Sequence, residues 1–192
     1  MIYWMSGLSG AGKTVIAHAM KEKLIKIGKS PYILDGDVLR MGLCSDLEYD
    51  IPHRKENLRR AAEVAAIVAK AGHDVICAFM TPTEACRTTV AEVLSERVII
   101  PEASPAVFVG IGTSLEVCMK RDAKGLYARY KKGKLKDMPG LDAPFTHMLA
   151  IERQHLKSYG IHAVQYRDMP DWSPEKHAEM IISRTEGPTF DI

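Results

Sequence analysis

The hydrophobic positions of this chain alternate between short apolar runs, which predict strands, and longer stretches, which predict helices. The predicted strands cover residues 2–6, 32–34, 75–79, 98–99, 106–109 and 163–167. The predicted helices cover residues 13–27, 54–71, 83–94, 114–121 and 174–183. Strands that alternate with helices favour a mainly parallel sheet, so we expect an α/β fold of three layers with helices on both faces of the sheet.

Glycine and charge mark the ends of these segments. Gly28 follows the first predicted helix and Gly72 the second, and glycine is the usual residue just past a helix. The stretch 124–140 is basic, contains glycine and has no clean periodicity, so we interpret a region of about residues 124–147 as a mobile lid over a site. The tail 186–192 is expected to be loose. The whole chain, 1–192, is expected to form a single domain.

Composition excludes several classes of protein. The chain has 192 residues, of which 26 are basic and 24 acidic, and the net charge of +2 gives no indication of nucleic-acid binding. No apolar run is long enough for a membrane span, and the first residues do not resemble a signal peptide. The four cysteines are scattered without metal-ligand spacing, which is typical of reduced thiols in a cytoplasmic protein.

The sequence G-L-S-G-A-G-K-T at residues 7–14 matches the phosphate-binding loop pattern, and it lies between a predicted strand and a predicted helix. Glycines let backbone N–H groups turn toward an anion, and the helix N-terminus adds partial positive charge. Lys13 would reach the β- and γ-phosphates, and the hydroxyl of Thr14 would bind Mg²⁺. We therefore predict that ATP and Mg²⁺ bind at Gly7, Leu8, Ser9, Gly10, Ala11, Gly12, Lys13 and Thr14.

Two aspartates follow the second predicted strand. In an extended segment Asp35 and Asp37 would point the same way, toward the carboxyl end of the sheet where ligands of open α/β folds bind. One carboxylate can hold the metal, and the other can accept the proton of an acceptor hydroxyl. Lys13, Asp35 and Asp37 are thus the candidate catalytic residues, and Asp37 is a candidate metal ligand with Thr14. The sequence leaves open which aspartate is the base. It also leaves open that the two aspartates form only a solvated turn without a functional role.

Further along the chain, basic residues could bind an anionic acceptor. Arg40 lies close to the two aspartates, while Arg54 and Asn57 are spaced to share one helix face. Tyr49 could stack on a base or cover the core, and the basic run 131–136 could close over phosphates or be a solvated loop.

Five motifs in this order resemble the adenylylsulfate (APS) kinase family. They are Gly7–Thr14, Asp35–Arg40, Arg54–Arg60, Ala78–Pro82 and Arg121–Tyr127, and the similarity extends over about residues 1–144. The resemblance implies a P-loop kinase that phosphorylates the 3′-hydroxyl of adenosine 5′-phosphosulfate with ATP, giving PAPS. It also implies a cytoplasmic homodimer with a sulfurylase as pathway partner.

The same resemblance implies roles for individual positions. Four residues would line the acceptor pocket, with two more behind them: Arg40, Tyr49, Arg54 and Asn57, then Met80 and Thr81. Arg121 would pack on the adenine of ATP, and Lys124 and Leu126 would lie in the lid.

Departures from the family pattern gather on the acceptor side. They are Val38, Tyr49, His53, Thr81 and Met138. Methionine stacks less specifically on a base than the aromatic residue usual in the family, so another 5′-derivatised nucleotide, such as cytidine diphosphoramidate in capsule biosynthesis, is an alternative acceptor. Two further alternatives are a nucleotide-binding module without catalysis and a scaffold subunit for a sulfurylase.

Overall fold

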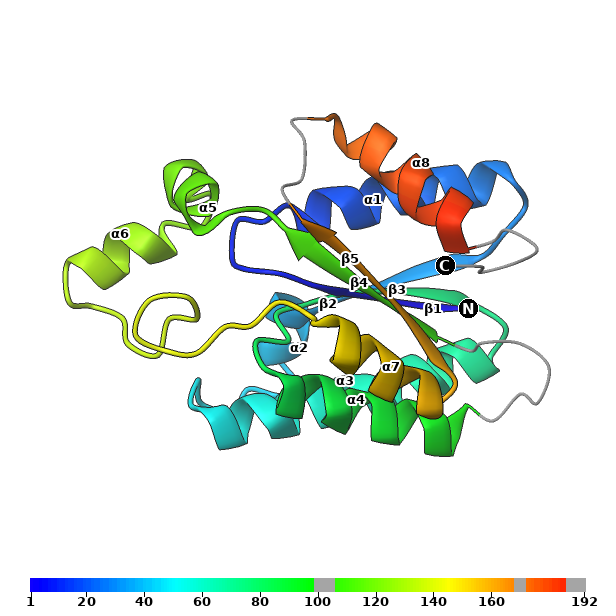
Figure 1. Ribbon diagram of the computed structural model, residues 1–192, viewed down its shortest axis with the longest axis horizontal. Helices are drawn as coiled ribbons and strands as arrows, with labels where there is room; N and C mark the ends of the chain where they lie inside the picture. Colours follow the sequence, from blue (N-terminus) through cyan, green and yellow to red (C-terminus); the bar gives the residue numbers. More distant parts are fainter. Residues whose placement is uncertain (99–105, 168–171, 186–192) are drawn as a thin grey trace.

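The computed structural model describes residues 1–98, 106–167 and 172–185, and the strands within them form one parallel sheet in the order β2-β3-β1-β4-β5 (Figure 1). The strands are β1 (Ile2–Ser6), β2 (Pro31–Asp35), β3 (Asp74–Phe79), β4 (Ala106–Gly112) and β5 (Ile161–Arg167). All of them end on the same edge of the sheet because each pair runs parallel. This edge carries the candidate site.

Helices cover both faces of the sheet, as the alternation of segments predicted (Figure 1). They are α1 (Lys13–Lys26), α2 (Gly36–Arg40), α3 (Ile51–Lys70), α4 (Glu84–Arg97), α5 (Leu115–Arg121), α6 (Leu126–Lys131), α7 (Ala150–Ser158) and α8 (Pro174–Thr185). Figure 1 shows α1 and α8 on one face and α3, α4 and α7 on the other, while α5 and α6 extend beyond the edge where the strands end. The predicted three-layer α/β fold is confirmed.

The central strand β1 divides the core into two halves. Ile2 and Trp4 are fully buried against α3 and α4, whereas Tyr3 and Met5 are fully buried against α1 and α8. Successive side chains of a strand point to opposite faces, so a strand between two helical layers is apolar throughout. The run at the start of the chain therefore marks the middle of the sheet, and the loop that follows it lies at the centre of the edge.

The ends of the helices follow local signals. Gly28, with φ of 80°, ends the turn after α1, and the N–H of Lys29 donates to the carbonyl of Leu24. Asp50 caps α3 by accepting a hydrogen bond from the N–H of His53 at 2.9 Å. Gly28 thus turns the chain at the edge of the sheet where the strands begin, opposite the site, whereas Asp50 fixes the start of α3 close to the site.

Several predicted elements differ from the structure. Residues after β2 form the short helix α2 and not an extended segment, because Asp35 caps it through the N–H of Asp37 at 2.9 Å. Helices α6 and α7 were not predicted. Val98 ends α4, so the strand predicted at 98–99 is wrong for Val98, and residue 99 lies outside the described residues. The tail predicted at 186–192 also lies outside them.

Among the described residues, no helix combines the length and apolar character needed to cross a membrane.

Candidate functional site

A cavity of about 770 Å³ lies at the edge of the sheet where the strands end. Its walls come from the loop after β1, from α2, from the start of α3, from the segment after α5 and from the start of α8. Most of the residues that the sequence singled out line this cavity: Ser9, Gly10, Ala11, Gly12, Lys13, Thr14, Asp35, Asp37, Arg40, Tyr49, Arg54, Asn57, Met80, Arg121, Lys124 and Leu126. Gly7, Leu8 and Thr81 do not line it.

The loop after β1 has the close-packed form of an anion cradle. A Cβ on Gly7 would lie 2.9 Å from the carbonyl oxygen of Ile111, so only glycine fits there. Gly12 has φ of 102°, a conformation that other residues rarely adopt, and it places the next N–H groups at the start of α1. A helix N-terminus that opens into a cavity is suited to phosphate groups.

Lys13 folds back over this loop. Its Nζ donates to the carbonyl oxygens of Gly7 at 2.7 Å and Leu8 at 2.8 Å. Burial and, next, the neighbouring charge of Lys124 lower the pKa of Lys13 to about 8, although Asp35 and Asp37 partly oppose this. The site thus holds an ammonium group that a negatively charged ligand would stabilise.

The two aspartates have different partners. Asp35 accepts a hydrogen bond from the hydroxyl of Thr14 at 2.8 Å, which joins the end of β2 to the start of α1. Asp37 is largely exposed, and its carboxylate forms an ion pair with Lys124 from the segment after α5. Both carboxylates face the cavity, so their predicted closeness to the loop is confirmed.

On the other side of the cavity, arginines surround an exposed tyrosine. The guanidinium of Arg40 lies 4.2 Å from the ring centroid of Tyr49, and that of Arg54 lies 5.5 Å from it. Arg54 also donates to the carbonyl oxygens of Tyr49 and, at 2.8 Å, of Asp137. Burial lowers the pKa of Arg54 below its usual value. Two cations held in one wall of a cavity can bind an anionic group.

Asn57 and Thr81 differ in whether they reach the cavity. The Oδ1 atom of Asn57 is buried with no hydrogen-bond partner in the described part of the chain, and the residue lines the cavity. Such an atom indicates a missing donor, which a ligand can supply. Thr81 is fully buried one layer behind, where its hydroxyl accepts from Nε1 of Trp4 at 3.1 Å and its carbonyl from the hydroxyl of Ser6. Thr81 therefore supports the wall without reaching the cavity.

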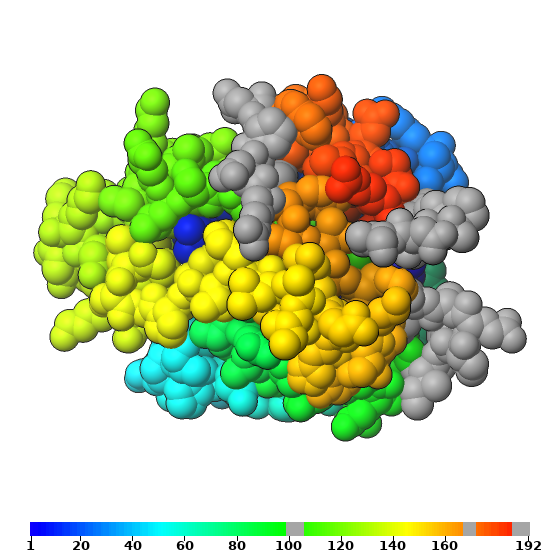
Figure 2. Space-filling model, in the orientation of Figure 1, coloured from blue at the N-terminus to red at the C-terminus, as the bar shows by residue number. Residues whose placement is uncertain are grey.

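The segment after α6 closes one side of the cavity. Asp142 holds a turn in it by accepting hydrogen bonds from the N–H groups of Met138 at 2.7 Å and Asp137 at 3.2 Å. Met138 is buried and lines the cavity. In the space-filling view this yellow segment lies in front, with only a small dark-blue area from the start of the chain visible beside it (Figure 2).

The cavity also contains residues that the sequence analysis missed, of which two carry aromatic rings. Trp172 and His177, at the start of α8, line the cavity, and their rings lie 5.6 Å apart. The Nε2 atom of His177 is buried and has no hydrogen-bond partner among the residues described. A lone Trp and a lone His carry no motif, and only the packing of α8 beside α1 brings them to the loop, so no local signal could have found them.

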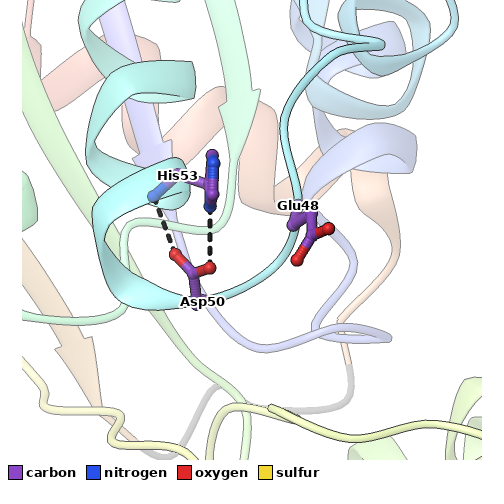
Figure 3. Close-up of side chains that lie close together, drawn as sticks. All are labelled: Glu48, Asp50 and His53. Atoms are coloured by element: carbon purple, nitrogen blue, oxygen red, sulfur yellow. Dashed lines mark hydrogen bonds and ion pairs between the residues drawn. The ribbon is translucent and has the colours of Figure 1, made fainter.

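A separate cluster lies at the start of α3, where Glu48, Asp50 and His53 bring ligand-type atoms within 4.8 Å of one another (Figure 3). Both oxygens of Asp50 already serve His53, one accepting from its N–H and the other lying 2.7 Å from Nδ1. These hydrogen bonds hold the pKa of Asp50 below its usual value. None of the three lines the cavity, and their contacts are those of a helix cap.

Comparison with known proteins gives a consistent result. The family model described as adenylylsulphate kinase matches residues 1–152. The adenylyl-sulfate kinase of Shewanella baltica (strain OS185) is 39% identical over 172 residues, which is 90% of this chain and 80% of the relative. That of Shewanella denitrificans is 40% identical over 169 residues, covering 88% and 79%. The structure of the Mycobacterium tuberculosis APS kinase in complex with AMPPNP and APS is 33% identical, with a TM-score of 0.81 and 97% of each chain covered.

Proposed function

The chain belongs to the adenylylsulphate kinase family, and from this premise we propose that it transfers the γ-phosphoryl group of ATP to the ribose 3′-hydroxyl of APS, giving PAPS. It is an enzyme, a phosphotransferase with an alcohol group as acceptor. One observation carries the proposal. The phosphate cradle and a pair of arginines, Arg40 and Arg54, line the same cavity. The alternative acceptor, cytidine diphosphoramidate, is not favoured, because the matched relatives are adenylyl-sulfate kinases.

The donor would bind along the loop of residues 7–14, with the triphosphate held by backbone N–H groups and by Lys13. The guanidinium of Arg121 lies 4.0 Å from the Cβ position of Gly12, just before the start of α1, and both residues line the cavity. The adenine would lie there, between Arg121 and the ring of Trp172. This orientation leaves the γ-phosphate facing the aspartates.

Mg²⁺ fits the donor set beside the loop. Thr14 and Asp35 offer a hydroxyl and a carboxylate within hydrogen-bond distance of each other, and Mg²⁺ prefers such oxygen ligands. Asp37 lines the same cavity and stays a candidate ligand. The ion supplies charge that offsets the negative charge of the transferring phosphoryl group.

The acceptor would bind against Arg40, Tyr49, Arg54 and Asn57. The two guanidinium groups would hold its phosphosulfate, and the unpartnered Oδ1 of Asn57 would accept a hydrogen bond from an O–H or N–H group of its nucleoside. Asp35 or Asp37 would take the proton from the hydroxyl. Lys124, Leu126 and the segment up to residue 147 would cover both nucleotides, since water must be kept from the γ-phosphate.

The test is an ADP-release assay with purified protein and three classes of acceptor: APS, cytidine diphosphoramidate and plain nucleosides. APS should give the highest kcat/KM. Arg54→Ala should raise the KM for APS about tenfold or more and leave that for ATP nearly unchanged. Arg97→Ala is the matched control, because Arg97 pairs with Glu63 on the surface. Faster turnover with another acceptor, or equal weakening of both substrates, would contradict the proposal.

We further propose a homodimer in the cytoplasm that works with a sulfurylase as pathway partner. The family resemblance supports these three points. Light scattering coupled to size-exclusion chromatography tests the homodimer, and the same measurement with an added sulfurylase tests that partnership. A monomer at micromolar concentration would count against the dimer.

A further inference from the structure

We propose that Arg60 is a positioning residue for acceptor binding, which acts through the loop of residues 41–50 and touches neither substrate. We call this segment, between α2 and α3, the acceptor loop. The inference rests on the proposed function, because that function assigns Arg40, Tyr49 and Arg54 to the acceptor. Arg60 itself does not line the cavity.

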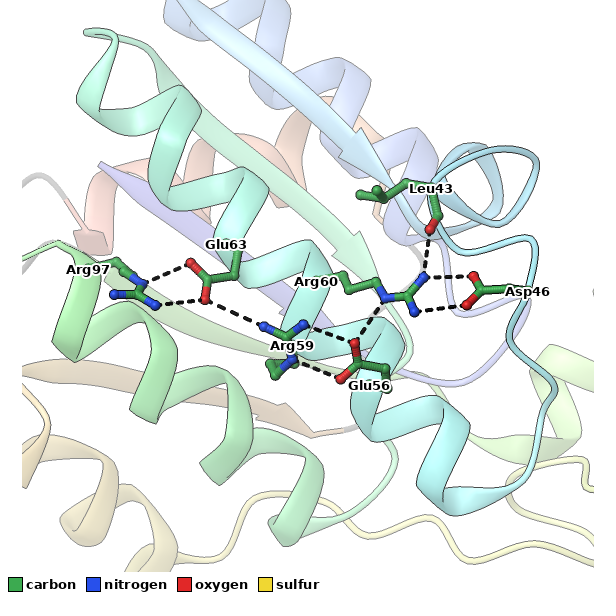
Figure 4. Close-up of polar contacts among 7 residues, drawn as sticks. All are labelled: Leu43, Asp46, Glu56, Arg59, Arg60, Glu63 and Arg97. Carbon is green, nitrogen blue, oxygen red and sulfur yellow. Dashed lines mark hydrogen bonds and ion pairs between the residues drawn. The ribbon is translucent and has the colours of Figure 1, made fainter.

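Arg60 binds the acceptor loop through most of its guanidinium group. Its Nη1 donates to the carbonyl oxygen of Leu43 at 2.8 Å and to Oδ1 of Asp46 at 2.7 Å, while its Nη2 donates to Oδ2 of Asp46 at 2.8 Å (Figure 4). Its Nε donates to Glu56 at 2.9 Å, which orients the group from within α3. A two-point pairing of guanidinium and carboxylate fixes both distance and angle. Arg60 thus fastens the loop to a helix of 20 residues.

The acceptor loop in turn holds the cavity arginines. The carbonyl oxygens of Leu47 and Glu48 accept from Nη1 of Arg40 at 3.0 Å and 3.1 Å, and the carbonyl of Tyr49 accepts from Arg54. These bonds are made by backbone atoms, so a displacement of the loop moves both guanidinium groups and the tyrosine ring between them. Small displacements of binding groups have large kinetic effects.

The further polar contacts of the acceptor loop lie mainly toward its C-terminal end, where Arg40 and Arg54 bind its carbonyl oxygens and Asp50 caps α3. Cys44 is buried, and its N–H donates to the carbonyl of Leu39 at 2.8 Å. The side chains of Met41 and Leu43, by contrast, are exposed. The pairing of Arg60 with Asp46 is therefore the strong polar contact that joins the middle of the loop to α3. The same contact holds the pKa of Asp46 below its usual value.

The neighbouring Arg59 provides a matched comparison within the same ladder of charges. It donates to Glu56 at 2.8 Å and 2.9 Å and pairs with Glu63 at 3.5 Å, and Glu63 continues the ladder to Arg97 on α4 (Figure 4). Arg59 thus resembles Arg60 in residue type, helix and carboxylate partner. Within the described part of the chain, the polar contacts of Arg59 are with Glu56 and Glu63 and none is with the acceptor loop.

The experiment compares Arg60→Met with Arg59→Met, since methionine keeps an unbranched apolar stem and removes the donors. Arg60→Met should raise the KM for APS about threefold to tenfold, with the KM for ATP and the thermal midpoint close to those of the wild type. Arg59→Met should change none of the three. Asp46→Asn should reproduce the effect of Arg60→Met, and the double variant should add little to either single change.

A second measurement does not depend on the substrate. Amide hydrogen exchange over residues 41–50 should be faster in Arg60→Met and in Asp46→Asn than in Arg59→Met and the wild type. If APS is not phosphorylated by the wild type, the proposed function fails, and the exchange result alone decides the positioning role. Unchanged exchange in both loop variants, an equal rise of both KM values, or the same behaviour of Arg59→Met would overturn the inference.

Discussion

At the scale of single residues, Lys13 shows how the fold prepares a group for its ligand. A lysine with a pKa of about 8 gains charge stability when a triphosphate comes next to it. The same group contributes a pH dependence to folding. The pKa of Lys13 in the folded protein lies below its ordinary value. Its unfavourable contribution to the free energy of unfolding is therefore largest below pH 8 and is relieved as the pH rises from about 8 to 10.5.

We expect the affinity for ATP to fall as the pH rises through about 8, because Lys13 loses its proton there in the unliganded protein. Binding between pH 8 and 9 should take up protons, which calorimetry in buffers of different ionisation enthalpy measures directly. Lys13→Arg keeps its charge at these pH values, so its affinity for ATP should vary less over this range. A wild-type affinity that is flat between pH 7 and 9.5 would contradict the pKa shift.

Lys13→Ala should lower kcat by about a hundredfold or more, because the ammonium acts on charge that develops in the transition state. Lys23→Ala, which removes a surface lysine paired with Glu179, should leave kcat unchanged. Stopped-assay measurements of ADP release at saturating substrates separate the two variants. Wild-type turnover in Lys13→Ala would refute the role proposed for Lys13.

The sequence revealed residues whose roles are determined by their immediate neighbours. Gly7 to Thr14 could be predicted because glycine geometry and a helix start are local properties. The prediction that Asn57 lies beside Arg54 required only the spacing of residues on a helix and the family motif. Trp172 and His177 could not be predicted, since their place depends on how α8 packs on α1, and Thr81 could not be told from a cavity residue without knowing which way the end of β3 turns.

At the scale of elements, a buried ion pair joins α4 to α7. The side chains of Arg87 and Glu152 are 1% and 4% exposed, and they pair through two hydrogen bonds. Arg87 also donates to the carbonyl oxygens of Thr81 at 3.0 Å and Thr146 at 2.9 Å. The end of β3, beside the cavity, and the end of the lid region are thus held by one guanidinium group.

Arg87→Met should destabilise the protein by about 3–5 kcal/mol, because it leaves the carboxylate of Glu152 buried without a partner. The double change Arg87→Met with Glu152→Leu should cost clearly less than the sum of the single changes. Urea unfolding of the wild type, the two single variants and the double variant gives the four free energies of unfolding that the double-mutant cycle needs. Additive costs would mean that the two side chains do not act as a pair.

Helices α6 and α7 show where prediction from local signals fails. Gly125 precedes α6 with φ of 64°, and Leu149 precedes α7, so neither residue at the N-cap position offers a capping side chain. The carboxylate of Asp122, three residues before Gly125, accepts instead from the N–H groups of Tyr127 and Ala128. Helix α6 spans only 6 residues within a basic stretch. Each forms because of its tertiary neighbours: Tyr127 of α6 donates to the carbonyl of Ser9, and Glu152 of α7 meets Arg87.

At the scale of the whole molecule, two helical layers on a parallel sheet leave one edge free, and the segment after α5 covers it. The lid region carries exposed lysines, namely Lys131, Lys132, Lys134 and Lys136. The predicted three-layer fold followed from the order of the segments alone. The shape of the lid region did not, because its polar residues have no periodicity and its turns depend on particular side chains, such as Asp142 with its two hydrogen bonds.

We expect ATP analogue and APS together to slow tryptic cleavage at residues 131–136 about tenfold or more, since closure lowers access to these lysines. Cleavage at Lys70, which is exposed at the end of α3 and does not line the cavity, should be much less affected. Mass spectrometry of timed digests measures both rates. Equal protection of the two regions would indicate general stabilisation by ligand in place of lid closure.

The guanidinium of Arg54 has a consequence that reaches beyond its own pocket. It donates one hydrogen bond to the carbonyl oxygen of Tyr49 in the acceptor loop and another to that of Asp137 in the lid region. An anion that draws this group toward itself would change how firmly the covering segment is held, and we propose that this segment also covers the donor. We therefore expect the two substrates to change one another's dissociation constants, by reciprocity by the same factor.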